Sequence, residues 1–258
     1  MGTVLDIASN GPTRVWTINL PDVGNAITGK DFIAAFETAV DDANADTSLC
    51  AVILTGTGKI FSAGGNVKEM ADRDGMFGLD AIDQRHAYID GIQRIPRALT
   101  RLEVPLIGAI NGPAIGAGCD LAMMCDVRVA SERAWFAESF VQLGLIPGDG
   151  GTWFLQRIVG YERAAEMTFT GDRVDAPTAL QWGMVSRVVP HEELLAEAQA
   201  LADRISNNPA HALRMAKRLL QESRTGSLES TLGMAAAMQP LAHRDPEHQH
   251  RIAKWKTR

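Results

Sequence analysis

Apolar and polar residues alternate with two different periods along most of the chain. Val15-Trp-Thr-Ile-Asn-Leu20 alternates apolar with polar, which is typical of a half-buried strand. The short apolar runs Ala51–Leu54 and Leu106–Ile110 are typical of strands that are buried on both faces. Between these runs, apolar residues recur at helical spacing, for example from Phe32 to Val40. Strands that alternate with helices predict an α/β core.

The remaining pattern predicts where this core ends. Residues 71–83 are polar and contain glycine, which favours a mobile loop or a frayed helix. A helix is expected at 84–102, where Pro96 should kink or split it. Further helices are expected at 117–124, 152–159, 194–205, 210–221 and 228–238, and a further strand is expected at 127–130. Only helices follow Pro190, so we predict a core over residues 1–190 and a C-terminal helical region over residues 191–258.

Composition and charge narrow the classes of protein. The 258 residues are 46% apolar and 22% charged, which is an ordinary globular mixture. A net charge of −6 argues against broad electrostatic binding to nucleic acid or to an anionic membrane. No apolar run is long enough to span a bilayer and the N-terminal residues do not resemble a secretory signal, so we predict a cytoplasmic protein. Cys50, Cys119 and Cys125 form no C-x-x-C pair. Cys119 and Cys125 lie in an apolar stretch and are expected to be buried thiols, and no metal site is expected.

Two glycine-rich turns fail the tests for nucleotide-binding motifs. Gly56-Thr-Gly-Lys59 lacks the glycine and the hydroxyl of a phosphate loop, because both required positions hold isoleucine. Gly116-Ala-Gly118 lacks the third glycine of a dinucleotide turn, because that position is Leu121. A nucleotide-binding α/β protein is therefore disfavoured.

Two junctions that follow apolar strands are rich in small residues, at 60–70 and at 110–120. Small residues let the backbone approach a ligand closely. The second junction opens a helix, whose first amides lack internal partners. Two amides directed at one point would form an oxyanion hole, and tight strand–helix packing is the alternative explanation.

Both junctions resemble the signature regions of the crotonase superfamily, the enoyl-CoA hydratases and isomerases. The resemblance extends from about residue 3 to 258, and its matching segments are Asn25-Ala26, 62–68, 111–126, 144–151, Thr170-Gly171 and 179–185. It implies a spiral of ββα units with a C-terminal helical region that forms a homotrimer or a dimer of trimers. It also implies an acyl-CoA thioester as substrate, no further cofactor and a role in fatty acid metabolism.

The resemblance also assigns residues by position. The oxyanion donors are the amides of Gly65 and of Ala117, where the family usually has glycine. The substrate-binding positions are Ala63, Gly65, Asn66, Val67, Lys68 and Gly116, of which residues 66–68 would contact the CoA adenine and phosphates.

The catalytic carboxylates are where this chain departs from the family. Asp120 matches the first family glutamate and lies one helical turn after Ala117. The second glutamate position holds Phe140, so Asp149, or else Glu138 on a regular strand, is expected to replace it. Two carboxylates suit hydration and one suits double-bond isomerisation. We therefore favour an enoyl-CoA hydratase, with an isomerase and a non-catalytic acyl-CoA-binding or interaction protein as alternatives.

Overall fold

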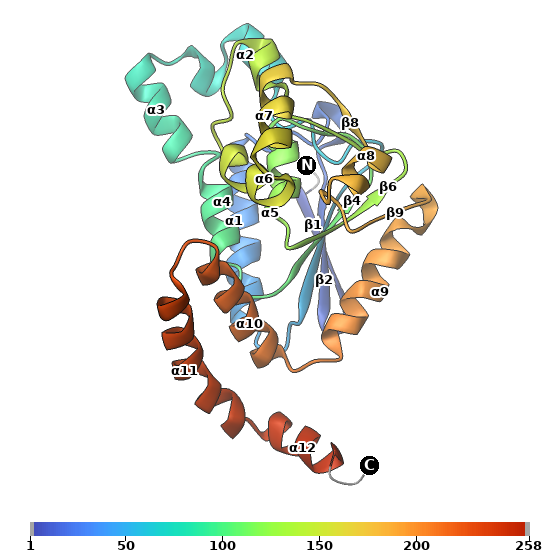
Figure 1. The fold of residues 1–258 in the computed structure, drawn as a ribbon. Coiled ribbons are helices and arrows are strands. Elements are labelled where there is room, and N and C mark those ends of the chain that lie inside the picture. Colours follow the sequence, from blue (N-terminus) through green and yellow to red (C-terminus); the bar gives the residue numbers. More distant parts are fainter. Residues whose placement is uncertain (1–2, 256–258) are drawn as a thin grey trace.

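The computed structural model describes residues 3–255, in which strands and helices alternate (Figure 1). The strands are β1 (Leu5–Asn10), β2 (Thr13–Ile18), β3 (Ala51–Gly56), β4 (Leu106–Ile110), β5 (Ala114–Ile115), β6 (Val127–Ser131), β7 (Trp135–Ala137), β8 (Val174–Asp175) and β9 (Arg187–Val189). The helices are α1 (Lys30–Ala45), α2 (Val67–Asp72), α3 (Ala81–Ile89), α4 (Arg94–Arg101), α5 (Ala117–Met124), α6 (Gly151–Val159), α7 (Tyr161–Thr170), α8 (Ala176–Gln181), α9 (Leu194–Ser206), α10 (Ala210–Ser223), α11 (Leu228–Arg244) and α12 (Pro246–Trp255). Short 3₁₀ helices cover Pro21–Val23, Gly75–Gly78, Ser139–Leu143 and His191–Glu193.

The strands form a six-stranded sheet in the order β1-β2-β3-β4-β6-β9 and a three-stranded sheet in the order β5-β7-β8. β1 and β2 pair antiparallel, and every later pair of the larger sheet is parallel. All residues of β3 and β4 are buried, which confirms the strands predicted from the two apolar runs. Parallel strands of this kind require cover on both faces.

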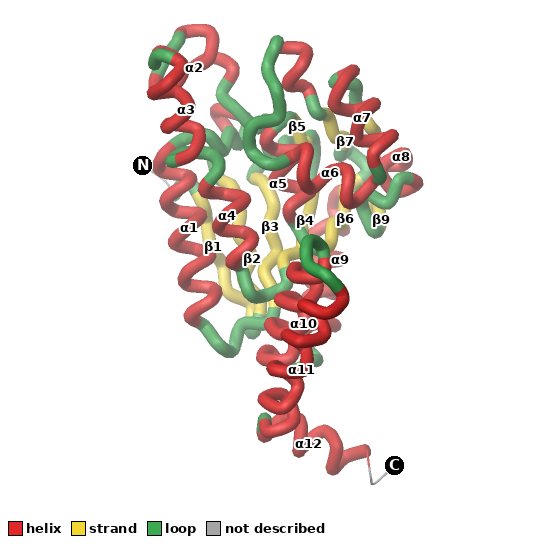
Figure 2. Tube along the Cα trace, turned by 60° about the vertical axis from the view of Figure 1, so that its left-hand side comes forward, coloured by secondary structure: helices red, strands yellow, loops and turns green. Residues whose placement is uncertain are grey.

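Helices supply this cover on the two faces of the larger sheet (Figures 1 and 2). On one face, Ile53 and Ile107 lie in a cluster with Leu194 and Ala198 of α9. On the other face, the main core takes in Val52 and Leu54 together with the apolar side of α1. The split arises because successive side chains of a strand point to opposite faces.

The segment between β3 and β4 is more helical than its sequence predicts. Residues 71–83 contain the end of α2, a 3₁₀ helix and the start of α3, which the Asp80 carboxylate caps by accepting from two amides at 2.9 Å. The helix expected at 84–102 is divided into α3 and α4, and the division falls before Pro96 rather than at it. Pro96 lies in the first turn of α4, where its missing N–H costs no hydrogen bond.

The C-terminal helices divide into two that pack on the core and two that extend from it. α9 covers the sheet and α10 contacts the core through Lys217 and Arg214, whereas α11 and α12 extend away from the body of the molecule (Figure 2). α11 continues to Arg244, beyond the predicted end at 238, and contains Pro240. The domain boundary at 190/191 stays a prediction.

A buried lysine joins α10 to the core. Lys217 Nζ donates to the carbonyl oxygen of Val104 at 2.7 Å and lies 2.8 Å from Asp126 Oδ2. The same carboxylate oxygen accepts from the Leu106 amide at 2.8 Å, so the contact ties α10 to the first residue of β4. Removing the lysine would leave the Val104 carbonyl without this donor.

We expect Lys217→Met to lower the free energy of unfolding by about 1–3 kcal/mol, because the charged donor is lost from a buried acceptor. Denaturant unfolding at neutral pH measures the change. Arg218→Met is the matched control, because the Arg218 guanidinium lies 3.9 Å from Glu222 on the exposed side of α10 and should contribute less than about 1 kcal/mol. Equal effects of the two variants would show that the Lys217 contact does not stabilise the packing of α10 on the core.

Candidate active site

The two junctions rich in small residues lie side by side. The amides of Phe61 and Ser62 donate to the carbonyl oxygen of Pro113 at 3.0 and 3.2 Å, and the Ile115 amide donates to Ser62 O at 3.0 Å. The approach is close enough to exclude side chains. A Cβ on Gly64 would lie 2.8 Å from Ala117 N, and one on Gly118 would overlap Ser62 O. Glycine at these positions therefore permits the contact.

The predicted helix at 117–124 is confirmed as α5, and Gly116 precedes it with φ +52°. The Gly116 amide donates to Ala137 O at 2.8 Å. In contrast, no hydrogen bond from the amides of Gly65 or Ala117 reaches any group in the described part of the chain. The two proposed donors thus belong to junctions in direct contact, and both are available to a ligand.

Three carboxylates are buried next to this contact. Asp120 lies on α5, Glu138 follows β7 and Asp149 precedes α6, with exposed fractions of 0%, 1% and 5%. Both oxygens of Asp120, both of Glu138 and Oδ1 of Asp149 are buried without a hydrogen-bond partner among residues 3–255. Such burial destabilises a fold unless the groups are protonated or bind a ligand, so the cluster marks a functional site.

The carboxylates alter one another's pKa values. Burial raises the pKa of Asp120 well above its usual range, and the charges of Glu138 and Asp149 raise it further. Burial raises the pKa of Glu138 to about 6 and also raises that of Asp149. Since three neighbouring ionised carboxylates would repel one another, the cluster favours holding a proton, and Asp120, whose pKa both neighbours raise, is the group best suited to hold it.

The start of α6 packs directly against Asp120. A Cβ on Gly151 would overlap Asp120 Oδ1, so glycine is needed where the turn at 147–151 meets α5. This packing brings Asp149 beside Asp120 although 28 residues separate them in the sequence. The structure therefore brings together Asp120 with both of the alternatives that the sequence left open.

Glu138 lies in the cluster although it is not on the regular strand that the sequence predicted. β7 ends at Ala137 and a 3₁₀ helix begins at Ser139, so the regular strand assumed for residues 136–140 does not exist. The half-buried Phe140 ring instead faces Gly116, where an added Cβ would lie 3.6 Å from Phe140 Cζ. An apolar ring therefore lies beside the amide junction at the position of the second family glutamate.

The predicted substrate-binding segment has its own local structure. Asn66 caps α2, with Oδ1 accepting from the Lys68 amide at 3.2 Å and Nδ2 donating to Glu69 Oε1 at 2.8 Å. The Ala63 amide donates to Gly24 O at 2.8 Å. Val67 and Lys68 are exposed. Their contacts with CoA stay predictions.

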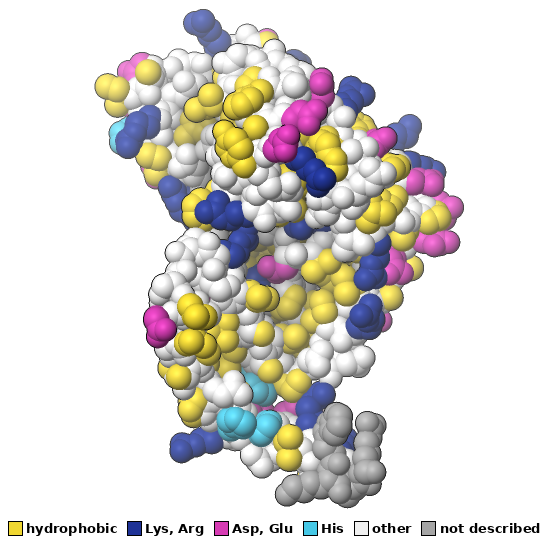
Figure 3. Space-filling model, viewed as in Figure 1, with side chains coloured by type: hydrophobic (Ala, Val, Ile, Leu, Met, Phe, Trp, Pro, Cys, Tyr) yellow, Lys and Arg dark blue, Asp and Glu magenta, His cyan; other side chains and the backbone are white. Residues whose placement is uncertain are grey.

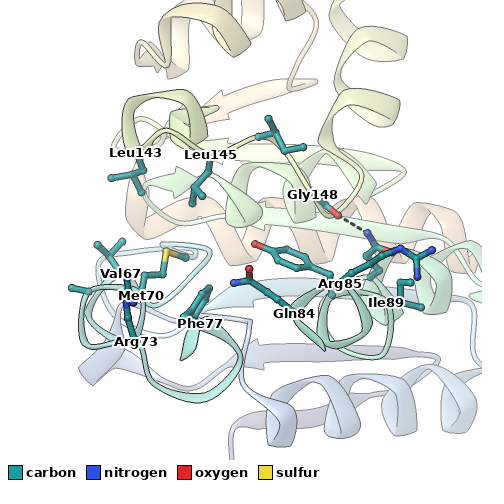
Figure 4. A pocket seen from close by; sticks show the side chains of 14 residues that line it. Val67, Met70, Arg73, Phe77, Gln84, Arg85, Ile89, Leu143, Leu145 and Gly148 are labelled. Carbon is teal, nitrogen blue, oxygen red and sulfur yellow. Dashed lines mark hydrogen bonds between the residues drawn. The ribbon is translucent and has the colours of Figure 1, made fainter. Parts of the chain in front are cut away.

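A cavity of about 890 Å³ lies between α2, α3 and the segment 143–148 (Figure 4). Its lining is largely apolar and includes Val67, Met70, Phe77, Tyr88, Leu143 and Leu145. Neither amide and none of the three carboxylates lines the cavity, but residues of its wall adjoin both parts of the site. A Cβ on Gly65 would lie 2.5 Å from Met70 Cε, and Gly148, which lines the cavity, directly precedes Asp149. Of these lining residues the sequence assigned Val67 to substrate binding, and no motif indicated the others, because each of the three segments is ordinary by itself.

Two further features concern residues 3–255 as a whole. In that range no group of three or more His, Cys, Asp or Glu side chains could hold a metal ion, and no helix is long and apolar enough to cross a membrane. Cys50, Cys119 and Cys125 are free and buried, which confirms the burial predicted for Cys119 and Cys125.

Two unpaired amides, three buried carboxylates and an apolar cavity whose wall includes Gly148 are features typical of an enzyme site. Residues 11–252 match the family model described as "Enoyl-CoA hydratase/isomerase". The chain belongs to this family, and the crotonase fold expected from the sequence is confirmed.

Relatives and solved structures support this placement. The chain is 35% identical to a short-chain-enoyl-CoA hydratase of Clostridium acetobutylicum over 88% of this chain and 84% of that protein. It is 36% identical to a crotonyl-CoA hydratase of Syntrophomonas wolfei over 85% and 82% of the two chains. The crystal structure of an enoyl-CoA hydratase from Bacillus anthracis matches with a TM-score of 0.90 and 29% identity, over 98% of this chain and 96% of the other.

We expect stability to fall as pH rises through the range in which Glu138 ionises. Its folded pKa, about 6, exceeds the value of about 4.3 for an unfolded glutamate, so the folded state binds more protons between these values. The contribution is fully present below the unfolded pKa and is lost above the folded one. Glu138→Gln should therefore reduce the fall in unfolding free energy between about pH 4.5 and about pH 7.5 by roughly 2 kcal/mol.

Denaturant unfolding at a series of pH values measures this difference. Glu132→Gln, at an exposed position a few residues earlier, serves as the matched control and should leave the fall unchanged. A Glu138→Gln variant with the same pH dependence as the unmodified protein would mean that Glu138 does not titrate as a buried group.

Proposed function

We propose that the protein hydrates a 2-enoyl-CoA thioester to the 3-hydroxyacyl-CoA, and catalyses the reverse dehydration. The observation that carries this proposal is the pair of buried, unpartnered carboxylates Asp120 and Asp149 beside the amides of Gly65 and Ala117. The hydratases named among the relatives support the same reaction. The reaction changes no oxidation state overall and is proposed to need no cofactor.

The two amides would bind the thioester oxygen. Hydrogen bonds to this oxygen withdraw electron density from C3 and make C3 electrophilic. Attack by water at C3 then places negative charge on the thioester oxygen, as an enolate. Donors that are already fixed in a site shielded from water stabilise this charge without reorganising. The rigid contact between the Gly64 and Ala117 junctions supplies that fixation.

The carboxylates would divide the proton transfers between them. Asp149 accepts a proton from water as the water oxygen bonds to C3, and protonated Asp120 delivers its proton to C2 as the enolate collapses. The proton on Asp149 then passes to Asp120, which restores the starting state. The assignment uses the pKa of Asp120, which burial and the two neighbouring carboxylates raise well above its usual range, so that the protonated form is favoured. We place Asp149 rather than Glu138 at the water because Asp149 adjoins Gly148 on the cavity wall.

The CoA portion would lie along the first junction and α2. Backbone atoms of Ala63, Asn66 and Gly116 border this path, and the exposed Lys68 ammonium is suited to a phosphate. Val67 follows Asn66 and lines the cavity, so the acyl group would enter the cavity where the CoA path ends.

One observation favours double-bond isomerisation as a second candidate. The Phe140 ring occupies the neighbourhood of Gly116, where family hydratases carry their second glutamate, and an apolar ring there reduces the space for a polar nucleophile. Isomerisation needs one carboxyl group that moves a proton between two carbons, and Asp120 alone suffices for this.

The C-terminal helices are proposed to form a homotrimer, or a dimer of trimers. Exposed leucines lie on α10 and α11, and apolar side chains are visible over this part of the surface in Figure 3. Exposed apolar surface of this kind is typical of an interface. The most exposed are Leu220, Leu228, Leu232 and Leu241.

The choice between the reactions follows from the conjugated thioester absorbance. We expect crotonyl-CoA to lose this absorbance as water adds, with little gain from a 3-enoyl-CoA. Gain with the 3-enoyl-CoA and no loss with crotonyl-CoA would instead establish isomerisation. No change with either, nor with a panel of longer acyl-CoA esters, would favour an acyl-CoA-binding protein without turnover.

We expect Asp120→Asn to reduce kcat by at least ~100-fold, the scale for a positioned acid or base, and to leave the affinity for a saturated acyl-CoA within about twofold. Asp149→Asn should give a similar loss. Steady-state kinetics and isothermal titration measure the two quantities. Asp22→Asn, at an exposed position, is the control. Near-normal turnover of either site variant would remove that residue from the mechanism.

A further inference from the structure

Tyr88 is a residue of α3 that the mechanism above does not use. It is half-buried and lines the cavity shown in Figure 4. Its ring packs on the turn that carries Asp149, because a Cβ on Gly148 would lie 3.1 Å from Tyr88 Cε1. The turn is further fixed by Gln93, whose Nε2 donates to Gly148 O at 2.9 Å, the dashed line in Figure 4.

The polar end of Tyr88 has no partner within the described structure. No hydrogen bond to or from its hydroxyl is formed with residues 3–255, and Asp149 Oδ1 is likewise unpartnered. Burial raises the pKa of the Tyr88 phenol, and the negative charge of Asp149 raises it further, in keeping with the contact between the Tyr88 ring and Gly148, the residue before Asp149. Arg73 and Arg85 are the charged side chains that line the same cavity. The Tyr88 phenol therefore lines the cavity beside the turn that carries the buried Asp149.

We propose that Tyr88, together with Asp149, binds the oxygen atom that is added to C3 of the substrate. This inference rests on the proposed hydratase function. Water would direct one hydrogen to Asp149, which removes it, and the other to Tyr88 Oη, while its lone pair forms the C–O bond. The hydrogen that faces Tyr88 stays on the oxygen and becomes the hydroxyl hydrogen of the 3-hydroxyacyl product. Tyr88 would thus contact water in one direction and the product hydroxyl in the other.

Measurements of CoA-ester binding to the Asp120→Asn variant, in which turnover is slow, test this contact directly. The probes are 3-hydroxybutyryl-CoA and butyryl-CoA, which differ by the oxygen in question. Adding Tyr88→Phe should weaken binding of the hydroxy ester by about threefold to tenfold and leave butyryl-CoA binding unchanged, as expected for one hydrogen bond. Equal losses for both esters, or no loss for either, would overturn the proposal, because Tyr88 would then only pack.

The chain offers a matched control, because it has 2 tyrosines and the other, Tyr161, is 72% exposed. Tyr161→Phe should change neither binding nor turnover. In the Tyr161→Phe protein, Tyr88 is the sole source of tyrosinate absorbance, and Asp149→Asn should shift its ionisation to lower pH. An unchanged ionisation would show that the two groups do not interact and would also overturn the proposal.

Turnover separates failure of this inference from failure of the proposed function. Tyr88→Phe in the otherwise unmodified enzyme should lower kcat for crotonyl-CoA hydration by about tenfold with little change in KM, because the enoyl substrate lacks the oxygen. If the unmodified protein hydrates crotonyl-CoA and Tyr88→Phe does so equally well, only the role of Tyr88 is wrong. If the unmodified protein hydrates no enoyl-CoA ester, the proposed function itself is wrong.

Discussion

The site depends on the contact between two strand-to-helix junctions, made by backbone atoms alone. Residues 61–62 and 113–115 are joined by hydrogen bonds, and Gly64 and Gly118 leave no room for a side chain between them. Because this contact uses the neighbouring amides, it fixes Gly65 and Ala117 while leaving their own N–H groups unpaired. It also sets the position of α5, and therefore of Asp120. A substituent at the contact would displace both the amides and the carboxylate.

Burying three carboxylates without donors opposes folding, and the fold tolerates this in two ways. First, burial and the neighbouring charges raise the pKa of Asp120, which favours its protonated form and so reduces the charge of the cluster. Second, the surrounding packing is tight, since Gly151 leaves the carboxyl group of Asp120 only the space it occupies. Polar groups held in this unfavourable state are typical of sites in which the reaction, rather than stability, determines the residues.

The sequence predicts those parts of the fold and site that depend on local pattern. The strands β3 and β4 and the helix α5 follow from short apolar runs bounded by glycine or by Asn111, and Asp120 follows from its spacing to Ala117. The position of Glu138 could not be predicted, because β7 ends at Ala137, one residue before it. The cavity could not be predicted either, because its lining comes from three separate segments that meet only in the folded chain.

The titratable groups of the site form a sequence from the core to the cavity. The pKa of Cys119, which is fully buried, is raised by burial and by Glu138, and Glu138 in turn interacts with Asp120. Asp120 interacts with Asp149, whose charge reaches Tyr88 on the cavity wall. One proton on Asp120, at the middle of this series, lowers the repulsion on both sides at once. Glu138 and Asp149 also interact directly, so the three carboxylates share one electrostatic environment, and Asp149 is the one that directly follows a residue of the cavity wall.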